Sequence, residues 1–225
     1  MPLTIAVDGP VGAGKSTICD AVAGKLDIIH LDTGAMYRAV GLAVRLNGID
    51  PQDEEKVCAL CAEGKAEVDV AYRDGRQVTL LNGADVSVKI REQEIGGYAS
   101  TVSRYKEVRR MLVAQQQLIA TKQDILIDGR DICTVVLPNA KIKIYLTASA
   151  EARAQRRRDQ LLAKGEDIPF EEILKEVNAR DWQDMHREAD PLRVAEDAVV
   201  VDTTELSFDE SVERIIRLVE EKRNA

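Results

Sequence analysis

Long apolar runs and aromatic residues are scarce in this sequence of 225 residues. Phe, Trp and Tyr together make up 4% of the residues, and Trp occurs once. No apolar run approaches the ~18 residues of a membrane-spanning helix, so we expect no membrane partner. The residues from Met1 to Asp8 lack the charged start and apolar segment of a secretory signal. These absences predict a cytoplasmic protein.

Cysteine is too scarce to hold the fold together. The four cysteines are Cys19, Cys58, Cys61 and Cys133, and a chain of this size does not depend on disulfides for its core. Cys58 and Cys61 fall in a helical pattern without a second cysteine pair, so a structural zinc site lacks ligands. We expect reduced thiols buried in the fold.

Positive charge is in deficit. Lys and Arg total 31 against 39 Asp and Glu, which gives a formal net charge of -8. This balance excludes a duplex-binding surface over the whole molecule, and we expect no nucleic-acid partner. Hydrophobic residues at 45% and charged residues at 31% exclude a disordered chain. The length suits one large domain.

Short β-rich runs alternate with helical patterns along most of the chain. The expected strands are Thr4 to Val7, Ile28 to Leu31, Ile125 to Ile127, Ile142 to Leu146 and Val199 to Val201. The expected helices are Lys15 to Lys25, Ala35 to Leu46, Glu54 to Glu63, Lys106 to Lys122, Ala150 to Lys164, Phe170 to Glu188 and Phe208 to Arg223. Such alternation predicts an α/β fold in which helices flank a five-stranded parallel sheet, with the ligand site at the carboxyl ends of the strands.

The stretch from Glu67 to Val88 breaks this alternation. Short strand patterns are separated there by Asp74-Gly75 and Asn82-Gly83, and both dipeptides favour tight hairpin turns. We therefore expect a small three-stranded antiparallel insert between the second and third strands of the main sheet.

A glycine-rich loop follows the first expected strand. Its residues, Gly9, Pro10, Val11, Gly12, Ala13, Gly14, Lys15, Ser16 and Thr17, fit the P-loop pattern of Gly, four residues, Gly, Lys and Ser or Thr. The N–H groups of such a loop and of the next helix receive the phosphates of a nucleoside triphosphate. Lys15 would reach the terminal phosphates, and Ser16 is the expected Mg²⁺ ligand. The sequence thus predicts a P-loop nucleotide-binding fold.

Two motifs of GTP switch proteins are missing from the sequence. Neither an Asp-x-x-Gly segment nor an Asn-Lys-x-Asp guanine reader occurs. Arginines are instead frequent at expected loops and helix ends. They include Arg38, Arg109, Arg110, Arg130, Arg153, Arg156, Arg157, Arg158, Arg180 and Arg187. A kinase with a phosphorylated acceptor needs such cations because it brings two polyanions together.

Several segments share one family pattern. They are the P-loop, residues 31–38 (LDTGAMYR), Ala99-Ser100 with Val108-Arg109, residues 127–131 (IDGRD), and Arg180-Asp181-x-x-Asp184-x-x-Arg187 followed by Pro191-Leu192. In this order, and over nearly the whole chain, they resemble the bacterial-type cytidylate kinases. The resemblance implies transfer of the ATP γ-phosphoryl group to CMP or dCMP, with Mg²⁺. Alternatives are a related P-loop kinase for UMP or AMP and a nucleotide-binding regulatory protein without turnover.

The resemblance also implies roles for single residues. Those implied to bind CMP are Arg38 and Arg130 at the acceptor phosphate, Arg180 and Asp184 near the sugar, and Thr33, Ser100, Arg109, Asp131 and Arg187 around the base. Asp131 is the candidate for cytosine preference, because a carboxylate accepts from the 4-amino group of cytosine but repels O4 of uracil. Apart from the resemblance, Arg180, Asp184 and Arg187 have the spacing of one helix face, so the carboxylate can orient both guanidiniums.

A closing lid is a further implication of the resemblance. Arg153 and Arg157 of this lid, with Lys15 and Arg130, are the expected catalytic residues, and their roles are electrostatic because the acceptor phosphate is already nucleophilic. Asp128 and Asp131 are both candidates to contact Mg²⁺ through water.

The expected single kinase domain has a core of residues 1–62, 93–152 and 190–225, a monophosphate-binding insert of about 63–92 and a lid of about 153–189. We expect a monomer.

Overall fold

The computed structural model describes residues 2–224, which fall into two compact units. Of the described residues, the first unit contains Pro2 and residues 29–124, and the second contains residues 3–28 and 125–224. The chain thus begins the second unit, leaves it for the first, and returns. None of the helices within the described residues combines the length and apolar character that crossing a bilayer requires.

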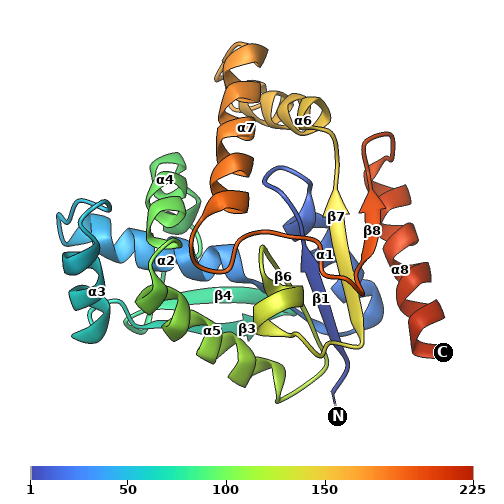
Figure 1. Cartoon of the computed structure of the whole chain (residues 1–225), viewed down its shortest axis with the longest axis horizontal. Helices are drawn as coiled ribbons and strands as arrows, with labels where there is room; N and C mark the ends of the chain where they lie inside the picture. Colours follow the sequence, from blue (N-terminus) through green and yellow to red (C-terminus); the bar gives the residue numbers. More distant parts are fainter. Residues whose placement is uncertain (1, 225) are drawn as a thin grey trace. The chain divides into compact units, whose positions relative to one another are not determined.

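Strands and helices alternate much as expected (Figure 1). The strands are β1 (Thr4–Asp8), β2 (Ile29–Asp32), β3 (Val68–Arg73), β4 (Arg76–Leu81), β5 (Ala84–Asp85), β6 (Ile125–Gly129), β7 (Ile142–Thr147) and β8 (Val199–Asp202). The α-helices are α1 (Lys15–Leu26), α2 (Thr33–Leu46), α3 (Glu54–Ala62), α4 (Gln93–Val102), α5 (Lys106–Ala120), α6 (Ala150–Leu162), α7 (Phe170–His186) and α8 (Phe208–Asn224). Two short helical turns are η1 (Lys89–Arg91) and the π-helical η2 (Ile132–Val136).

The main sheet has five strands in the order β2-β6-β1-β7-β8. Strand β1 pairs in parallel with β6 and β7, and β7 pairs in parallel with β8. All of β6 and nearly all of β1 and β7 are buried, which explains why most of their residues are apolar, because parallel strands are covered on both faces. The predicted five-stranded parallel sheet flanked by helices is confirmed.

Helices α1 and α8 cover one face of β1, β7 and β8 in the second unit (Figure 1). The contact side chains of α8 are Val212, Ile215, Leu218 and Val219. Their spacing places them on one stripe of a 3.6-residue helix, and each buried aliphatic side chain contributes about 1.5–3 kcal/mol. This packing fixes β1, and with it the loop that follows β1.

Helices α6 and α7 form a helical pair with its own small core (Figure 1). Ala154, Leu161, Ile173 and Val177 make up the buried part of this core. Helix α6 begins where the Ser149 Oγ accepts a hydrogen bond from the Ala152 N–H at 3.1 Å, a standard N-cap. The chain then turns back toward α7 through the glycine at position 165.

The predicted antiparallel insert is confirmed in the first unit. Its strands are β3, β4 and β5, paired in that order. Asp74 and Gly75 have φ of 52° and 73°, and Asn82 and Gly83 have φ of 49° and 78°. Two successive positive φ angles define the turn type whose twist matches a hairpin, so the turn dipeptides determine this part of the fold locally.

Helix α4 was not expected from the sequence. It contains Gly96 and Gly97, and glycine disfavours a helix interior by about 1 kcal/mol. Its formation depends on packing against α2. A Cβ at Gly41 of α2 would lie 2.9 Å from the Ala99 backbone N, so the glycine allows the two helices to approach closely. Tertiary contact therefore overrides local propensity here.

Candidate active site

The P-loop connects β1 to α1 in the second unit, as the sequence pattern requires. Gly9 has a φ of 154°, and a Cβ there would lie 1.9 Å from the Leu146 carbonyl oxygen. Gly12 has a φ of 75°, and its Cβ would lie 3.3 Å from the Cβ of Arg153. A side chain at Gly9 would displace the loop, so Gly9 is required by space as well as by backbone angle, whereas Gly12 is required mainly by its positive φ.

The Lys15 side chain folds back onto its own loop. Its Nζ donates hydrogen bonds to the carbonyl oxygens of Gly9 and Pro10, both at 2.7 Å. Burial, followed by repulsion from Arg130, lowers the pKa of Lys15 to about 7. An ammonium held in this way is poised for phosphate, because the negative charge of a nucleotide would favour its protonated form.

Ser16 lies beside an acidic residue at the carboxyl end of β6. The Ser16 Oγ donates to the Asp128 Oδ2 at 3.1 Å, and Asp128 is opposite Val7 in the β1–β6 ladder. A hydroxyl and a carboxylate oxygen at this separation are the hard ligands that Mg²⁺ prefers, so these residues fit a magnesium site. Asp131, the other candidate, forms an ion pair with Arg187 at 3.3 Å.

Asp8 is a buried site residue that the sequence analysis missed. Its carboxylate accepts hydrogen bonds from the N–H groups of Ile132 at 2.7 Å and Cys133 at 2.8 Å. Burial, the largest effect, raises the pKa of Asp8 to about 6. These bonds anchor the π-helical turn directly after Arg130 and Asp131. Its position at the end of a strand, one residue before the P-loop, was the available sequence signal.

Asp184 of α7 is shared by two guanidiniums. It accepts from the Arg130 Nε at 2.8 Å and from the Arg180 Nε at 3.2 Å. Burial raises its pKa, but Arg130 and then Arg180 outweigh that effect, so the pKa of Asp184 is lowered overall. Burial and repulsion by Arg130 lower the pKa of Arg180. We call these three residues the shared-carboxylate cluster; an anion placed there would favour both charged guanidiniums.

The expected helical spacing holds for only part of the predicted triad. Arg180 and Asp184 pair at i, i+4 as predicted. Helix α7 ends at His186, however, so Arg187 follows the helix in extended backbone. Its Nε donates to the Asp190 carbonyl at 2.9 Å, and its Nη2 contacts Asp131. The prediction that all three share one helix face is therefore wrong for Arg187, because the helix stops one residue earlier.

The arginines of α6 differ in their surroundings. The Arg153 side chain is 5% exposed and forms an ion pair with Asp181 at 2.6 Å. Arg156 donates to the backbone carbonyl of Thr203 at the end of β8. Arg157 is partly exposed and, among the residues that the structure describes, has no hydrogen bond or ion pair. Arg157 is thus the cation with freedom to reach a ligand, and Arg153 is held in place.

Four predicted CMP-binding residues belong to the first unit. Thr33 begins α2 and is buried, and Ser100 is buried in α4. The Nη1 of Arg38 donates to the Ile90 carbonyl at 3.1 Å. Arg109 is buried in α5, with its guanidinium carbon 5.8 Å from the ring centroid of Tyr37, a cation–π distance. The fold holds each of these side chains in a defined position within its unit.

Gln77 of β4 supports the segment that carries Thr33. The Asp32 N–H donates to the Gln77 Oε1 at 2.7 Å, and the Gln77 Nε2 donates to the Asp32 carbonyl at 3.3 Å. The Asp32 Oδ1 in turn accepts from the Ala35 N–H at 3.1 Å and caps α2. The hairpin insert therefore holds the start of α2 through one amide side chain, a role that the sequence analysis did not find.

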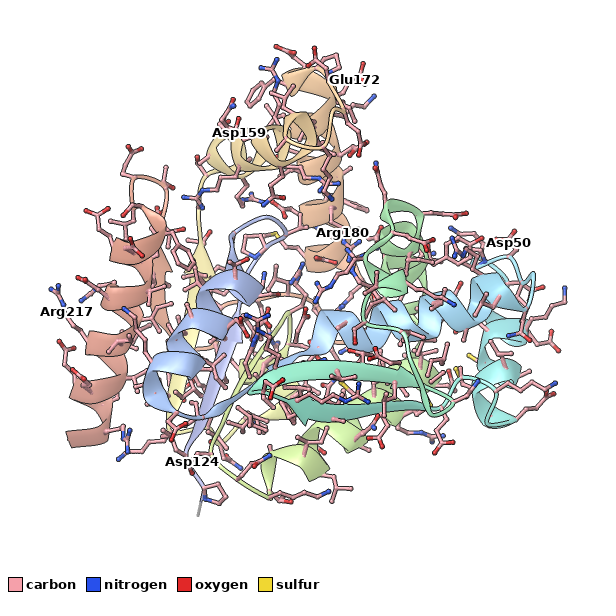
Figure 2. The ribbon with its side chains drawn as sticks, turned by 180° about the vertical axis from the view of Figure 1, so that it is seen from behind. Asp50, Asp124, Asp159, Glu172, Arg180 and Arg217 are labelled. Atoms are coloured by element: carbon pink, nitrogen blue, oxygen red, sulfur yellow. The ribbon has the colours of Figure 1, made fainter. Side chains whose placement is uncertain are left out.

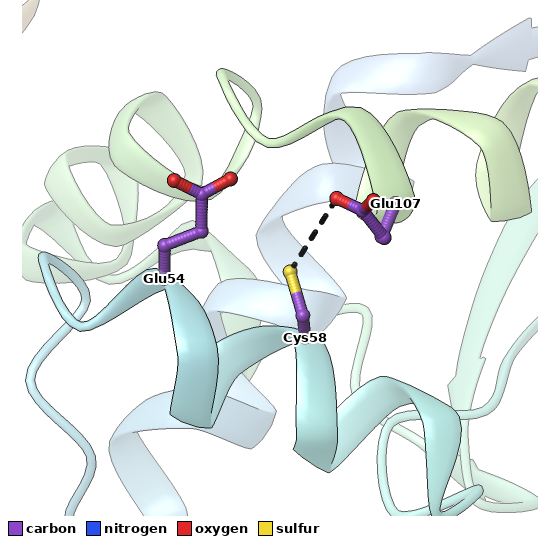
Figure 3. Close-up of side chains that lie close together, drawn as sticks. All are labelled: Glu54, Cys58 and Glu107. Carbon is purple, nitrogen blue, oxygen red and sulfur yellow. Dashed lines mark hydrogen bonds between the residues drawn. The ribbon is translucent and has the colours of Figure 1, made fainter.

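A separate group of polar side chains joins α3 and α5 in the first unit. The ligand atoms of Glu54, Cys58 and Glu107 lie within 4.8 Å of one another (Figure 3). The Cys58 Sγ donates to the Glu107 Oε2 at 3.8 Å, which accounts for the contact. Burial, then the charge of Glu107, raises the pKa of the Cys58 thiol.

All four cysteines are free, as predicted, but Cys58 and Cys61 are partly exposed and not buried.

Comparison with known sequences agrees with this geometry. The family described as Cytidylate kinase matches residues 5–221. A cytidylate kinase from Caldicellulosiruptor bescii is 50% identical over 216 residues, which cover 96% of this chain and 95% of that protein. One from Thermosipho melanesiensis is 45% identical, covering 99% of each chain. One from Bacillus subtilis is 44% identical, covering 98% of this chain and 97% of that protein. The chain belongs to the cytidylate kinase family.

Proposed function

We propose that this protein transfers the γ-phosphoryl group of ATP to CMP and dCMP, giving ADP and CDP or dCDP. The observation that carries the proposal is the shared-carboxylate cluster in a P-loop protein of this family. Asp184 orients two guanidiniums there: the fork of Arg130 matches the oxygens of a phosphate monoester, and Arg180 is assigned with Asp184 to the sugar of the same acceptor. A P-loop supplies the donor site, and the cluster supplies the acceptor site.

The proposed catalysis is electrostatic. Phosphoryl transfer has a loose transition state, so positioning and charge neutralisation account for most of the rate enhancement. Lys15 would leave the carbonyls of Gly9 and Pro10 and bind the transferring phosphate. Arg130 would hold the acceptor phosphate, and Arg157 would reach the phosphates as the α6–α7 lid closes. When bound by Ser16, with Asp128 nearby, Mg²⁺ would neutralise charge on the phosphate oxygens.

The remaining assignments are also proposals. Thr33, Arg38, Ser100 and Arg109 of the first unit, and Asp131 and Arg187 of the second, are assigned to CMP by the family resemblance. The insert of about 63–92 is assigned to monophosphate binding, and residues of about 153–189 to the lid. We further infer a cytoplasmic monomer that binds no nucleic acid; gel filtration tests the oligomeric state.

An ADP-release assay tests the activity. Mg-ATP would be supplied with CMP, dCMP, UMP, AMP or GMP in turn, beside a Lys15→Ala control. We expect turnover with the two cytidine acceptors and loss of that turnover in the control. Preference for another acceptor would refute the cytidine assignment and retain the kinase class. Nucleotide binding without turnover on any acceptor would favour the regulatory alternative.

Cytosine selection has its own test. Because Asp131 faces Arg187 at 3.3 Å, an Asp131→Asn variant keeps the shape and removes the charge. We expect its KM for CMP to rise and its discrimination against UMP to fall, since an amide can donate to O4 of uracil. Unchanged discrimination against UMP would refute the assignment of Asp131.

A further inference from the structure

Nearly all the donors of the Arg153 guanidinium are already in use. Its Nε donates to the Ala148 carbonyl at 2.9 Å, and its Nη1 donates to the Val11 carbonyl at 2.9 Å and to the Asp181 Oδ1 at 3.1 Å. Its Nη2 donates to the Asp181 Oδ2 at 2.6 Å. An arginine has five N–H donors, so a single N–H of Nη2 remains. Arg153 has little capacity left for a phosphate in this arrangement.

Asp181 determines where this guanidinium lies. Its two carboxylate oxygens accept from the two Nη atoms of Arg153 in the paired geometry that fixes both distance and plane. The ion pair is well shielded from water, with side-chain exposures of 5% for Arg153 and 15% for Asp181. The two charges balance one another, so the pair does not need a ligand for charge neutralisation.

Arg153 also contacts the P-loop. The Val11 carbonyl belongs to the loop and accepts from Arg153. The adjacent Gly12 packs against the Arg153 stem, where an added Cβ would lie 3.3 Å from the Arg153 Cβ. Arg153 thus bonds to one loop residue and packs against the next. A shift of this side chain would therefore move the loop, and the N–H groups of a P-loop are the donors that bind phosphates.

Asp181 also directly follows Arg180 in α7. Arg180 and Asp184 belong to the shared-carboxylate cluster, which we assign to the acceptor, and Arg180 lies well along α7 from Glu172 (Figure 2). The same helical turn therefore carries a contact to the acceptor cluster and, through Arg153, a contact to the donor loop. A movement of this turn would be transmitted to both.

We propose that Asp181 is a positioning residue that holds Arg153 against Val11 and so sets the affinity of the P-loop for the phosphates of ATP. Through the shared turn of α7, it links acceptor binding to donor binding. The link to the acceptor rests on the proposed function. The effect on the loop does not, because it requires only a nucleotide in the P-loop.

Calorimetric titration of Mg-ATP without any acceptor tests the effect on the loop. An Asp181→Asn variant loses the charge that orients Arg153, and we expect its Kd for ATP to rise about tenfold. Asp181→Glu restores a carboxylate and should recover part of the affinity. Asp159→Asn is the matched control, since Asp159 is an exposed residue of α6 whose side chain bonds only to Gln155 among the described residues. We expect no change in that control.

The link to the acceptor has a kinetic test. In Asp181→Asn the KM for ATP should rise about tenfold, whereas the Kd for CMP in the absence of ATP should change less than twofold. The dependence of ATP affinity on bound CMP should shrink. Arg153→Lys keeps the charge but lacks the planar fork, so it should resemble Asp181→Asn and provides the test if that variant is unstable.

Specific results would overturn the proposal. Unchanged ATP affinity in both Asp181→Asn and Arg153→Lys would refute it. An equal loss in Asp159→Asn would refute a specific role for Asp181, and a rise in KM for CMP alone would place Asp181 on the acceptor side. Failure of the cytidine assignment would be seen separately: the wild-type protein would prefer an acceptor other than CMP or dCMP, and the results of the ATP titrations would stay the same.

Discussion

Helix α7 carries two aspartate–arginine systems that differ in charge balance. Asp184 is shared by Arg130 and Arg180. Asp181 has a single arginine, Arg153, which also bonds to backbone carbonyls. Two cations on one anion favour the approach of another anion, whereas a balanced pair tied to the main chain favours a fixed position. On this ratio of charges we propose that the first system binds a ligand and the second positions a loop.

Exposure follows the same division. The side chains of Arg130 and Arg180 are 21% and 29% exposed, while that of Arg153 is 5% exposed. Within helix α7 and its partners, the two arginines of the shared-carboxylate cluster are therefore the more accessible to solvent, and Arg153 is the less accessible. The predictions that follow test this division.

Removing the shared carboxylate should have the largest effect. Asp184→Asn leaves two largely buried guanidiniums without their anion, and the free energy of unfolding should fall by about 3–5 kcal/mol. Asp181→Asn should lose less, because Arg153 keeps two backbone acceptors. Urea denaturation of both variants measures the difference. Equal losses would contradict the contrast between the two systems.

Removing one cation from the cluster should affect the acceptor selectively. Arg180→Met keeps much of the side-chain volume and removes a fork, so kcat/KM for CMP should fall about 100-fold while the KM for ATP stays nearly constant. Steady-state kinetics with each substrate varied measures this. Arg217→Met on α8 is the control, since the one hydrogen bond and ion pair of the Arg217 side chain among the described residues is with Glu213. A rise in the KM for ATP would contradict the assignment.

ATP binding should depend on pH through Lys15. With a pKa of about 7, Lys15 is charged below pH 7 and loses its proton above it, whereas bound phosphate requires the ammonium form. ATP affinity should therefore weaken about tenfold between pH 6 and pH 8, with proton uptake on binding at pH 8. Calorimetry in buffers of different ionisation enthalpy measures the uptake. Asp181→Asn should lower affinity and keep this pH slope; a pH-independent affinity in the wild type would refute the Lys15 mechanism.

Gln77 is an uncharged side chain that, like the ion pair of Asp181 and Arg153, holds a main-chain segment in place. Gln77→Leu removes both hydrogen bonds to the Asp32 main chain, and the free energy of unfolding should fall by about 1 kcal/mol. Thermal or urea denaturation measures this, with Gln155→Leu at an exposed position of α6 as the control. Asp32 directly precedes Thr33, which is assigned to CMP. A loss of stability without any change in the Kd for CMP would therefore limit Gln77 to a purely structural role.

The sequence predicted the parts of the fold that are encoded locally. The hairpin turns at Asp74-Gly75 and Asn82-Gly83 follow from residues that tolerate positive φ. The P-loop follows from its glycines between an apolar strand and a helix. Helix α4 could not be predicted in the same way, because it contains two glycines and forms against Gly41 of α2. Local propensity and tertiary packing disagree there, and packing prevails.

The candidate site shows the same limit. The pairing of Arg180 with Asp184 follows from helical spacing, but the end of α7 at His186 separates Arg187 from that face. Asp8 bonds to the turn after β6, and its partners are more than 120 residues away in the chain. Residue spacing predicts contacts within a helix, but it does not predict contacts between residues that are far apart in the chain.

The sequence by itself determined the fold class, the donor loop, the arginine-rich character and the family of this protein, because these depend on local patterns and motifs. The tertiary structure decided which arginines have carboxylate partners and which of those partners are shared. Sequence spacing cannot distinguish Arg153 from Arg157, since both lie in one helix with the same side-chain chemistry. Only the three-dimensional arrangement places one against Asp181 and Val11 and leaves the other without a partner among the described residues.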